Sequence, residues 1–314
     1  MNRQQQGKNE RHSRTIRLWL IAILSCTLIA GTVILIRYGT ELAAEKKTET
    51  ELAEIYHAGG RAEAEETKDS GVTERPSRPD TADEQTPEQK ADPAGTGTTA
   101  PDTAPRITGR LSAIAYPDNP DLTVSRRFLE LLNKNEDIVG WLELNDSMQW
   151  AVVQRDHTFY MDHDALKNKN RNGAIFLDVS VSLETRPYTL LLYGHNMKSG
   201  AMFGCLRNYE NPNYCARNRF ISFSSLYEEG RYVIFAAGRI GIEEGQPDYI
   251  DPFSMLSDNA EERAEMIDRL KKASAWSGSV DVSPEDQLLI LVTCVDDDDH
   301  RRVVAARRLR EGEN

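Results

Sequence analysis

Two reactive side chains stand close behind apolar runs that read as β-strands. His195 follows the run from Tyr188 to Tyr193, and Cys294 follows the run from Leu288 to Thr293. A thiol becomes a useful nucleophile when a neighbouring group lowers its pKa or takes its proton, and imidazole is the usual partner. The two residues are about a hundred positions apart, so only the fold can bring them together.

A third group, Arg302, begins the apolar run that returns after the polar loop behind Cys294. An arginine keeps its charge in proteins, so it suits the oxyanion that forms when a thiolate attacks a carbonyl. Cysteine, histidine and arginine together are typical of a transpeptidase. Each also has a plainer interpretation, because a histidine at a strand end is often structural and an unpaired cysteine often serves as a small apolar residue.

Short strands dominate the second half of the chain, and turn residues separate them. One helix is predicted from Ser125 to Asn133, and another over Glu261 to Ala275, where Asp258 stands at capping-box spacing. Many short strands with few helices favour a mainly β fold, a closed β-barrel with helical insertions. The predicted strands cover Trp150 to Val153, Ala174 to Leu177, Tyr188 to Tyr193, Tyr232 to Ala237, Leu288 to Thr293 and Val303 to Leu309.

The N-terminal region predicts a transmembrane signal anchor at 18–36, an uncharged run long enough as a helix to cross a bilayer. Residues 1–17 are rich in Arg and Lys, whereas the far flank is mixed in sign, so the positive-inside rule leaves 1–17 in the cytoplasm and the rest outside. A cleaved signal peptide is the alternative, with the two alanines at 43–44 as its nearest candidate cleavage site.

Three segments follow the anchor. Residues 37–67 are predicted to form a solvated juxtamembrane helical stalk, broken at Gly59 and Gly60. Residues 68–106 contain six prolines, no aromatic residue and no Leu, which predicts a disordered linker that could hold the domain well away from the membrane. Residues 107–314 are then the extracellular catalytic domain.

Net charge, cysteines and carboxylate clusters limit which ligands and partners the chain is expected to bind. The chain has 314 residues and a formal net charge of −12, which argues against nucleic acid. Cys205 and Cys215 either pair or remain two buried thiols. No cofactor or metal is expected, although a Ca²⁺-binding adhesion module is a rival function because carboxylates cluster at Asp162 to Asp164 and Asp296 to Asp299.

Several motifs together resemble the class B sortases, the membrane-anchored cysteine transpeptidases of Gram-positive bacteria. The resemblance runs through most of residues 125–309, and its family histidine, cysteine and arginine fall on His195, Cys294 and Arg302, with Arg301 as the runner-up. The chain departs from the family after the cysteine, where aromatic residues are often found and this sequence has aspartates. The motifs are NEDIVGWLEL (135–144), VVQRDHTFYMDHD (152–164), GAIFLDVS (173–180), YTLLLYGHNMKSGAMFGCLRNY (188–209), VSPEDQLLILVTC (282–294) and RRVVAARRL (301–309).

The resemblance implies a single-pass membrane enzyme, with the catalytic domain outside the cell, that anchors surface proteins to the cell wall. It would cleave a C-terminal sorting motif, NPQTN-like or S/P-P-x-T-G-like, at its Thr and transfer the acyl group to an amine of a peptidoglycan cross-bridge or its lipid-linked precursor. Tyr193, Tyr249 and Ile250 are the implied substrate-binding residues. A pilin-polymerising sortase and an inactive sortase-like binding scaffold are the alternatives.

Overall fold

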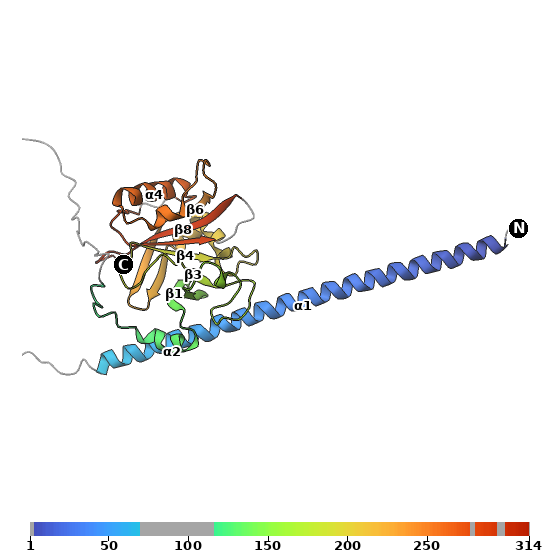
Figure 1. The fold of residues 1–314 in the computed structure, drawn as a ribbon, viewed down its shortest axis with the longest axis horizontal. Helices are drawn as coiled ribbons and strands as arrows, with labels where there is room; N and C mark the ends of the chain where they lie inside the picture. Colours follow the sequence, from blue (N-terminus) through green and yellow to red (C-terminus); the bar gives the residue numbers. More distant parts are fainter. Residues whose placement is uncertain (1–2, 70–115, 277–279, 294–298, 314) are drawn as a thin grey trace, which may run out of the picture.

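A closed eight-stranded β-barrel is the centre of the molecule, with strand order β1-β2-β3-β4-β7-β8-β6-β5 (Figure 1). The computed structural model describes residues 3–69, 116–276, 280–293 and 299–313. The predicted fold class, a mainly β closed barrel with helical insertions, is confirmed. The strands are β1 (Ile138–Asn145), β2 (Met148–Val153), β3 (Ile175–Leu177), β4 (Thr189–Gly194), β5 (Phe220–Ser225), β6 (Glu229–Gly241), β7 (Leu288–Thr293) and β8 (His300–Arg308).

Helices and short 3-10 turns join these strands. Helix α4 lies over β6 and β8 in Figure 1, and α2 lies against α1. The α-helices are α1 (Arg3–Asp69), α2 (Arg126–Lys134), α3 (Pro212–Arg217) and α4 (Ala260–Ala273), and the 3-10 turns are η1 (Phe159–Met161), η2 (Phe203–Glu210) and η3 (Pro252–Leu256).

Strand β7 is buried on both faces, which explains its unbroken apolar sequence. Leu289 and Leu291 point into the barrel and join the inner core, whereas Ile290 and Val292 point outward and join a second core beneath α4. This alternation continues in β4 and β8. Side chains on the central strands therefore divide between the barrel interior and the α4 side, a division that decides where the site residues point.

The predicted elements match the structure with small shifts at their ends, and two strands lacked a prediction. The helix predicted from Ser125 is α2, which begins at Arg126 with Ser125 as its N-cap. Helix α4 is capped by Asn259 rather than Asp258, because the Asn259 side chain accepts the backbone N–H groups of the first turn. β1 and β5 were not predicted. In β1 buried and exposed residues do not alternate strictly, because the neighbouring residues Trp141 and Leu142 are buried on opposite faces of the strand.

Helix α1 corrects the prediction of a solvated stalk. Leu52 and Tyr56 are each only 2% exposed and belong to a core cluster with Phe128 and Trp141. Tyr56 stacks on Trp141 with ring centroids 4.6 Å apart, and its hydroxyl donates to Ser224 at 2.9 Å. The C-terminal third of this helix is thus part of the packed domain.

The glycine pair in α1 does not break the helix, contrary to the prediction. A Cβ atom at Gly59 would lie 2.7 Å from the Cα of Arg127, and one at Gly60 would lie 2.9 Å from the guanidinium carbon of the same residue. Real Cβ atoms do not come so close, so glycine is what allows α1 and α2 to approach. The ion pair between Glu66 and Arg126 extends this contact to the end of α1.

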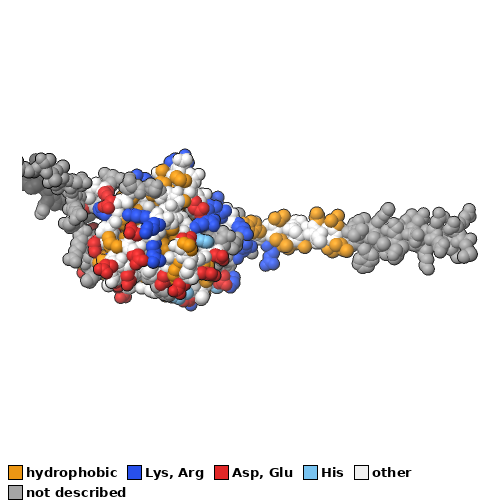
Figure 2. Space-filling view, turned by 90° about the horizontal axis from the view of Figure 1, so that it is seen from above, with side chains coloured by type: hydrophobic (Ala, Val, Ile, Leu, Met, Phe, Trp, Pro, Cys, Tyr) orange, Lys and Arg blue, Asp and Glu red, His pale blue; other side chains and the backbone are white. Residues whose placement is uncertain are grey.

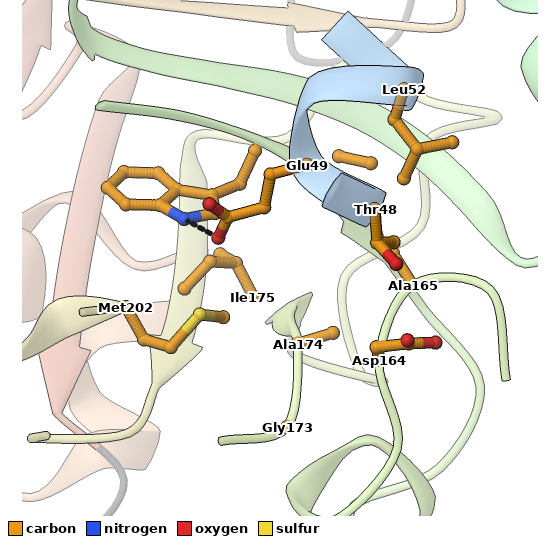
Figure 3. A pocket seen from close by; sticks show the side chains of 11 residues that line it. Thr48, Glu49, Leu52, Asp164, Ala165, Gly173, Ala174, Ile175 and Met202 are labelled. Atoms are coloured by element: carbon orange, nitrogen blue, oxygen red, sulfur yellow. Dashed lines mark hydrogen bonds between the residues drawn. The ribbon is translucent and has the colours of Figure 1, made fainter. Parts of the chain in front are cut away.

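A second contact lies about three turns before Gly59, where the Trp150 indole donates to Glu49 at 2.8 Å. Figure 3 shows Glu49 and Leu52 beside a small cavity of about 30 Å³, whose other walls include Ala174 and Ile175. The helix therefore packs against the barrel at Thr48 and Glu49 as well as at Leu52 and Tyr56.

The apolar part of α1 projects away from the domain (Figure 2). Its stretch Ile23–Thr40, with mean hydropathy 1.6 and no burial, is long and apolar enough to cross a membrane. From Thr40 to Glu49 the helix rises only about 13 Å at 1.5 Å per residue. The predicted linker at 68–106 lies outside the described residues except for its first two, which end α1. Because the helix itself joins the apolar stretch to the barrel, this linker does not lie between the two.

Candidate active site

Strands β4, β7 and β8 are adjacent, and at one edge of the barrel they place His195, Thr293 and Arg302 at or next to strand ends. β4 and β7 are parallel, with Gly194 opposite Thr293, and β7 and β8 are antiparallel, with Val292 opposite Val303. His195 follows Gly194 directly, and Cys294 follows Thr293. Cys294 itself lies outside the described residues, so its neighbours define the site.

The histidine is half-buried and held by the segment between β2 and β3. Its Nε2 lies 2.6 Å from the carbonyl oxygen of Met161. A carbonyl can only accept, so this hydrogen bond requires the proton on Nε2 and leaves the Nδ1 lone pair as the base in neutral imidazole. Gly173, with φ +64°, packs against the ring, and a Cβ there would lie 3.1 Å from Cδ2 of His195.

Arg302 lies beside the residue that precedes the cysteine. Its backbone N–H donates to Thr293 Oγ1 at 3.0 Å, and its side chain is 12% exposed. The guanidinium Nε donates to Glu210 Oε1 at 2.8 Å. Glu210 also accepts from Nε of Arg239 at 3.3 Å, so two arginines share one carboxylate oxygen.

Arg301 points the other way, because successive residues of a strand face opposite sides. It lines a cavity of about 300 Å³ together with Thr293 and outward-facing apolar residues of β4, β6 and β7. Of the three predicted substrate-binding residues, Tyr193 and Ile250 line this cavity, whereas Tyr249 is outside its lining and pairs with Gly241 through a β-bridge. The full lining is Tyr193, Ile240, Gly241, Ile242, Ile250, Pro252, Met255, Val292, Thr293 and Arg301.

Two other cysteines are unsuited to nucleophilic chemistry. Cys205 and Cys215 are free thiols, not a disulfide, and both are buried. Burial raises the pKa of the Cys205 thiol to about 12 and that of Cys215 to about 11. Neither thiol therefore ionises appreciably at neutral pH.

The carboxylates of the predicted Ca²⁺ alternative have other partners where the structure describes them. Asp162 pairs with Lys169 and His163, and Asp164 accepts backbone N–H groups of Leu166 and Asn168. Of the run Asp296 to Asp299, only Asp299 is among the described residues. Within the described ranges no group of three or more His, Cys, Asp or Glu side chains could hold a metal ion.

Sequence reasoning missed the residues that hold the predicted ones. Met161 and Gly173 support His195, and Glu210 pairs with Arg302 from a segment more than ninety positions away. None of the three stands in a recognisable local pattern for this role. Gly173 has a positive φ and follows a turn rich in Asn. Such a turn before a glycine is a weak sequence signal for a position where another residue would be strained.

Comparison with known proteins defines the family. No protein-family model matches the sequence. The chain is 30% identical to sortase B of Listeria monocytogenes over 180 residues, covering 56% of this chain and 69% of the relative. It is 26% identical to sortase B of Staphylococcus aureus over 177 residues, covering 55% and 69%. The Staphylococcus aureus sortase B–substrate complex superposes with a TM-score of 0.54 at 26% identity, covering 60% of this chain and 87% of that chain.

The barrel topology is thus that of a sortase-type transpeptidase. The chain belongs to the class B sortases.

Proposed function

We propose that this chain is a membrane-anchored cysteine transpeptidase in which Cys294 is the nucleophile, His195 the general acid and base, and Arg302 the cation that stabilises the oxyanion. One observation carries the proposal: the register of β4, β7 and β8, with Gly194 opposite Thr293 and Arg302 hydrogen-bonded to Thr293. The high pKa of the two other extracellular thiols supports the choice of nucleophile.

The reaction would proceed in two acyl transfers. The Cys294 thiolate attacks the carbonyl carbon of a Thr in the sorting peptide, and Arg302 stabilises the tetrahedral oxyanion. The C–N bond breaks, His195 gives its proton to the departing amine, and a thioester remains. An acceptor amine then attacks the thioester, His195 takes the proton from that amine, and the thiolate leaves as the new amide forms.

The apolar cavity beside Thr293 is the proposed subsite for peptide side chains. Tyr193 and Ile250 supply apolar surface to its lining, and Arg301 supplies a positive charge. A short C-terminal sorting motif, NPQTN-like or S/P-P-x-T-G-like, fits a cavity of about 300 Å³ that takes a few side chains at most. The acceptor would be an amine of a peptidoglycan cross-bridge or its lipid-linked precursor.

Anchoring is the second part of the proposal. The unburied apolar stretch of α1 would span the membrane, with the Arg- and Lys-rich N-terminus in the cytoplasm and the barrel outside. The folded catalytic unit would include the C-terminal part of α1, because Leu52 and Tyr56 belong to its core, rather than begin at residue 107.

The test uses the full chain in detergent with fluorogenic peptides of both motif types and triglycine as the acceptor. We expect cleavage after Thr, an amide product with triglycine, and loss of both in Cys294→Ala while the melting temperature is retained. Turnover that persists in Cys294→Ala would refute the nucleophile assignment. Peptide binding without cleavage would favour the inactive scaffold, and transfer to a pilin lysine instead of triglycine would favour pilin polymerisation.

Arg301 is the second candidate for the oxyanion role, and its place in the cavity lining favours it. Arg302 faces the opposite side of β8 but is bonded to the residue next to the thiol. Separate alanine variants at 301 and 302 decide between them, as described in the Discussion.

A further inference from the structure

A single carboxylate lies between two arginines at the edge of the barrel where the proposed site is located. Arg239 of β6 and Arg302 of β8 are directly opposite in the antiparallel register. Oε1 of Glu210 accepts from Nε of Arg302 at 2.8 Å and from Nε of Arg239 at 3.3 Å. The three side chains are 12%, 36% and 31% exposed for Arg302, Arg239 and Glu210, so the cluster is only partly screened by water.

Like charges directly opposite each other across two strands repel. The register makes Arg239 and Arg302 such a pair, and their half-buried position strengthens the repulsion relative to open solvent. A carboxylate that contacts both guanidinium groups removes this repulsion.

The backbone around Glu210 is fixed on both sides. Tyr209 and Leu206 of η2 are buried in the barrel core, and Asn211 caps α3 by accepting two backbone N–H groups. The carboxylate is therefore presented from a rigid segment rather than from a free loop. Rigid support is what a residue needs if it is to hold another side chain in a productive position.

We propose that Glu210 is a positioning residue, which bridges Arg239 and Arg302 and thereby holds the Arg302 guanidinium where it can stabilise the oxyanion. This inference rests on the proposed function of Arg302. It assigns no contact between Glu210 and the peptide. It also gives Arg239 a defined part, as the charge whose repulsion Glu210 offsets.

The bridge predicts a pattern that simple loss of a stabilising contact does not. Glu210→Ala is expected to lower kcat about 10- to 100-fold and to change KM by less than about threefold. This loss of kcat does not exceed the loss expected when an oxyanion donor itself is removed. Glu210→Gln keeps an acceptor oxygen but loses the charge, so its kcat is expected to lie between those of Glu210→Ala and the unmodified chain.

The decisive variant is one that removes the repulsion between Arg239 and Arg302 without restoring Glu210. Because Arg239→Gln removes the opposing charge, the double variant Glu210→Ala, Arg239→Gln is expected to recover kcat at least threefold over Glu210→Ala alone. Glu184→Ala, at an exposed position in the loop between β3 and β4, is the matched control and is expected to leave kcat unchanged.

The assays use the full chain in detergent with the fluorogenic sorting peptides, and each variant is also melted. A kcat for Glu210→Ala within twofold of the unmodified chain, or a double variant no faster than Glu210→Ala, would overturn the bridge. If the unmodified chain shows no Cys294-dependent turnover, the proposed function fails instead. The bridge is then judged by melting alone, where the double variant must regain part of the melting temperature lost in Glu210→Ala, and no regain overturns it.

Discussion

Replacing Tyr56 by alanine tests whether the C-terminal part of α1 is structural. Tyr56 is 2% exposed, stacks on Trp141 at 4.6 Å, meets Phe128 edge-on at 5.5 Å, and donates to Ser224 at 2.9 Å. Truncating a buried aromatic side chain to alanine destabilises a protein by about 3–5 kcal/mol. For a domain of this size each kcal/mol lowers the melting temperature by about 2–4 °C, so Tyr56→Ala should lower it by roughly 6–20 °C.

Two further variants separate the parts of this effect. Tyr56→Phe keeps the ring contacts and removes only the buried hydrogen bond to Ser224, which should destabilise by about 1–2 kcal/mol. Glu54→Ala changes an exposed residue on the opposite side of the same helix and should have an effect within about 0.5 kcal/mol. The melting temperature is therefore expected to be highest for Glu54→Ala, lower for Tyr56→Phe and lowest for Tyr56→Ala.

The assay is thermal unfolding of the full chain in detergent, followed by near-ultraviolet circular dichroism. This signal reports tertiary packing around aromatic side chains, whereas the far-ultraviolet signal would be dominated by the long helix α1. If Tyr56→Ala melts within about 2 °C of Glu54→Ala, the helix is a solvated stalk and the packing argument is wrong.

Three other outcomes are expected. Arg302→Ala should lower kcat about 10²–10³-fold if it alone serves the oxyanion, while Arg301→Ala should mainly raise KM, and steady-state kinetics showing the reverse would exchange their roles. In a chain whose other two cysteines are replaced by serine, Cys205 and Cys215 should resist alkylation at pH 8 until the protein is unfolded. The reason is that burial raises the pKa of the Cys205 thiol to about 12 and that of the Cys215 thiol to about 11. Mass spectrometry counts the alkyl labels on each chain. Burial also raises the pKa of the Tyr56 phenol, so its stabilising contribution should be complete below the unfolded pKa of about 10 and be lost as pH rises above it; the melting temperature of Tyr56→Phe should then fall less between pH 9 and 11 than that of the unmodified chain.

Sequence patterns predicted the elements whose information is local. The run before Cys294 is apolar at every position, and a strand buried on both faces requires such a run, so β7 was found with its ends at Leu288 and Thr293. The helix from Ser125 was found because its cap and apolar stripe are short-range features. The three proposed catalytic residues were also named from sequence, since their types suit the chemistry and their motifs resemble a family.

The docking of α1 could not be read from local pattern. Its contact face is carried by Leu52, Tyr56 and the glycine pair, which are few and spread over several turns among polar residues. A pair of glycines in a helix ordinarily signals a break, because glycine lowers helix stability. Here the two glycines lie where α2 approaches so closely that a Cβ atom would clash with Arg127, and this role becomes visible only when α2 is in place.

The sequence by itself determined six of the eight strands, that a thiol and an imidazole stand at the ends of two of them, and that an apolar stretch precedes the domain. Tertiary structure alone decided that Arg301 is the one of the two arginines that lines the cavity, that Glu210 meets Arg302 and Arg239, and that α1 is packed against the barrel. The physical reason is the range of the interactions. Strand formation and capping depend on neighbours in the chain, whereas ion pairs and helix docking depend on atoms that only the closed barrel brings within a few ångströms of each other.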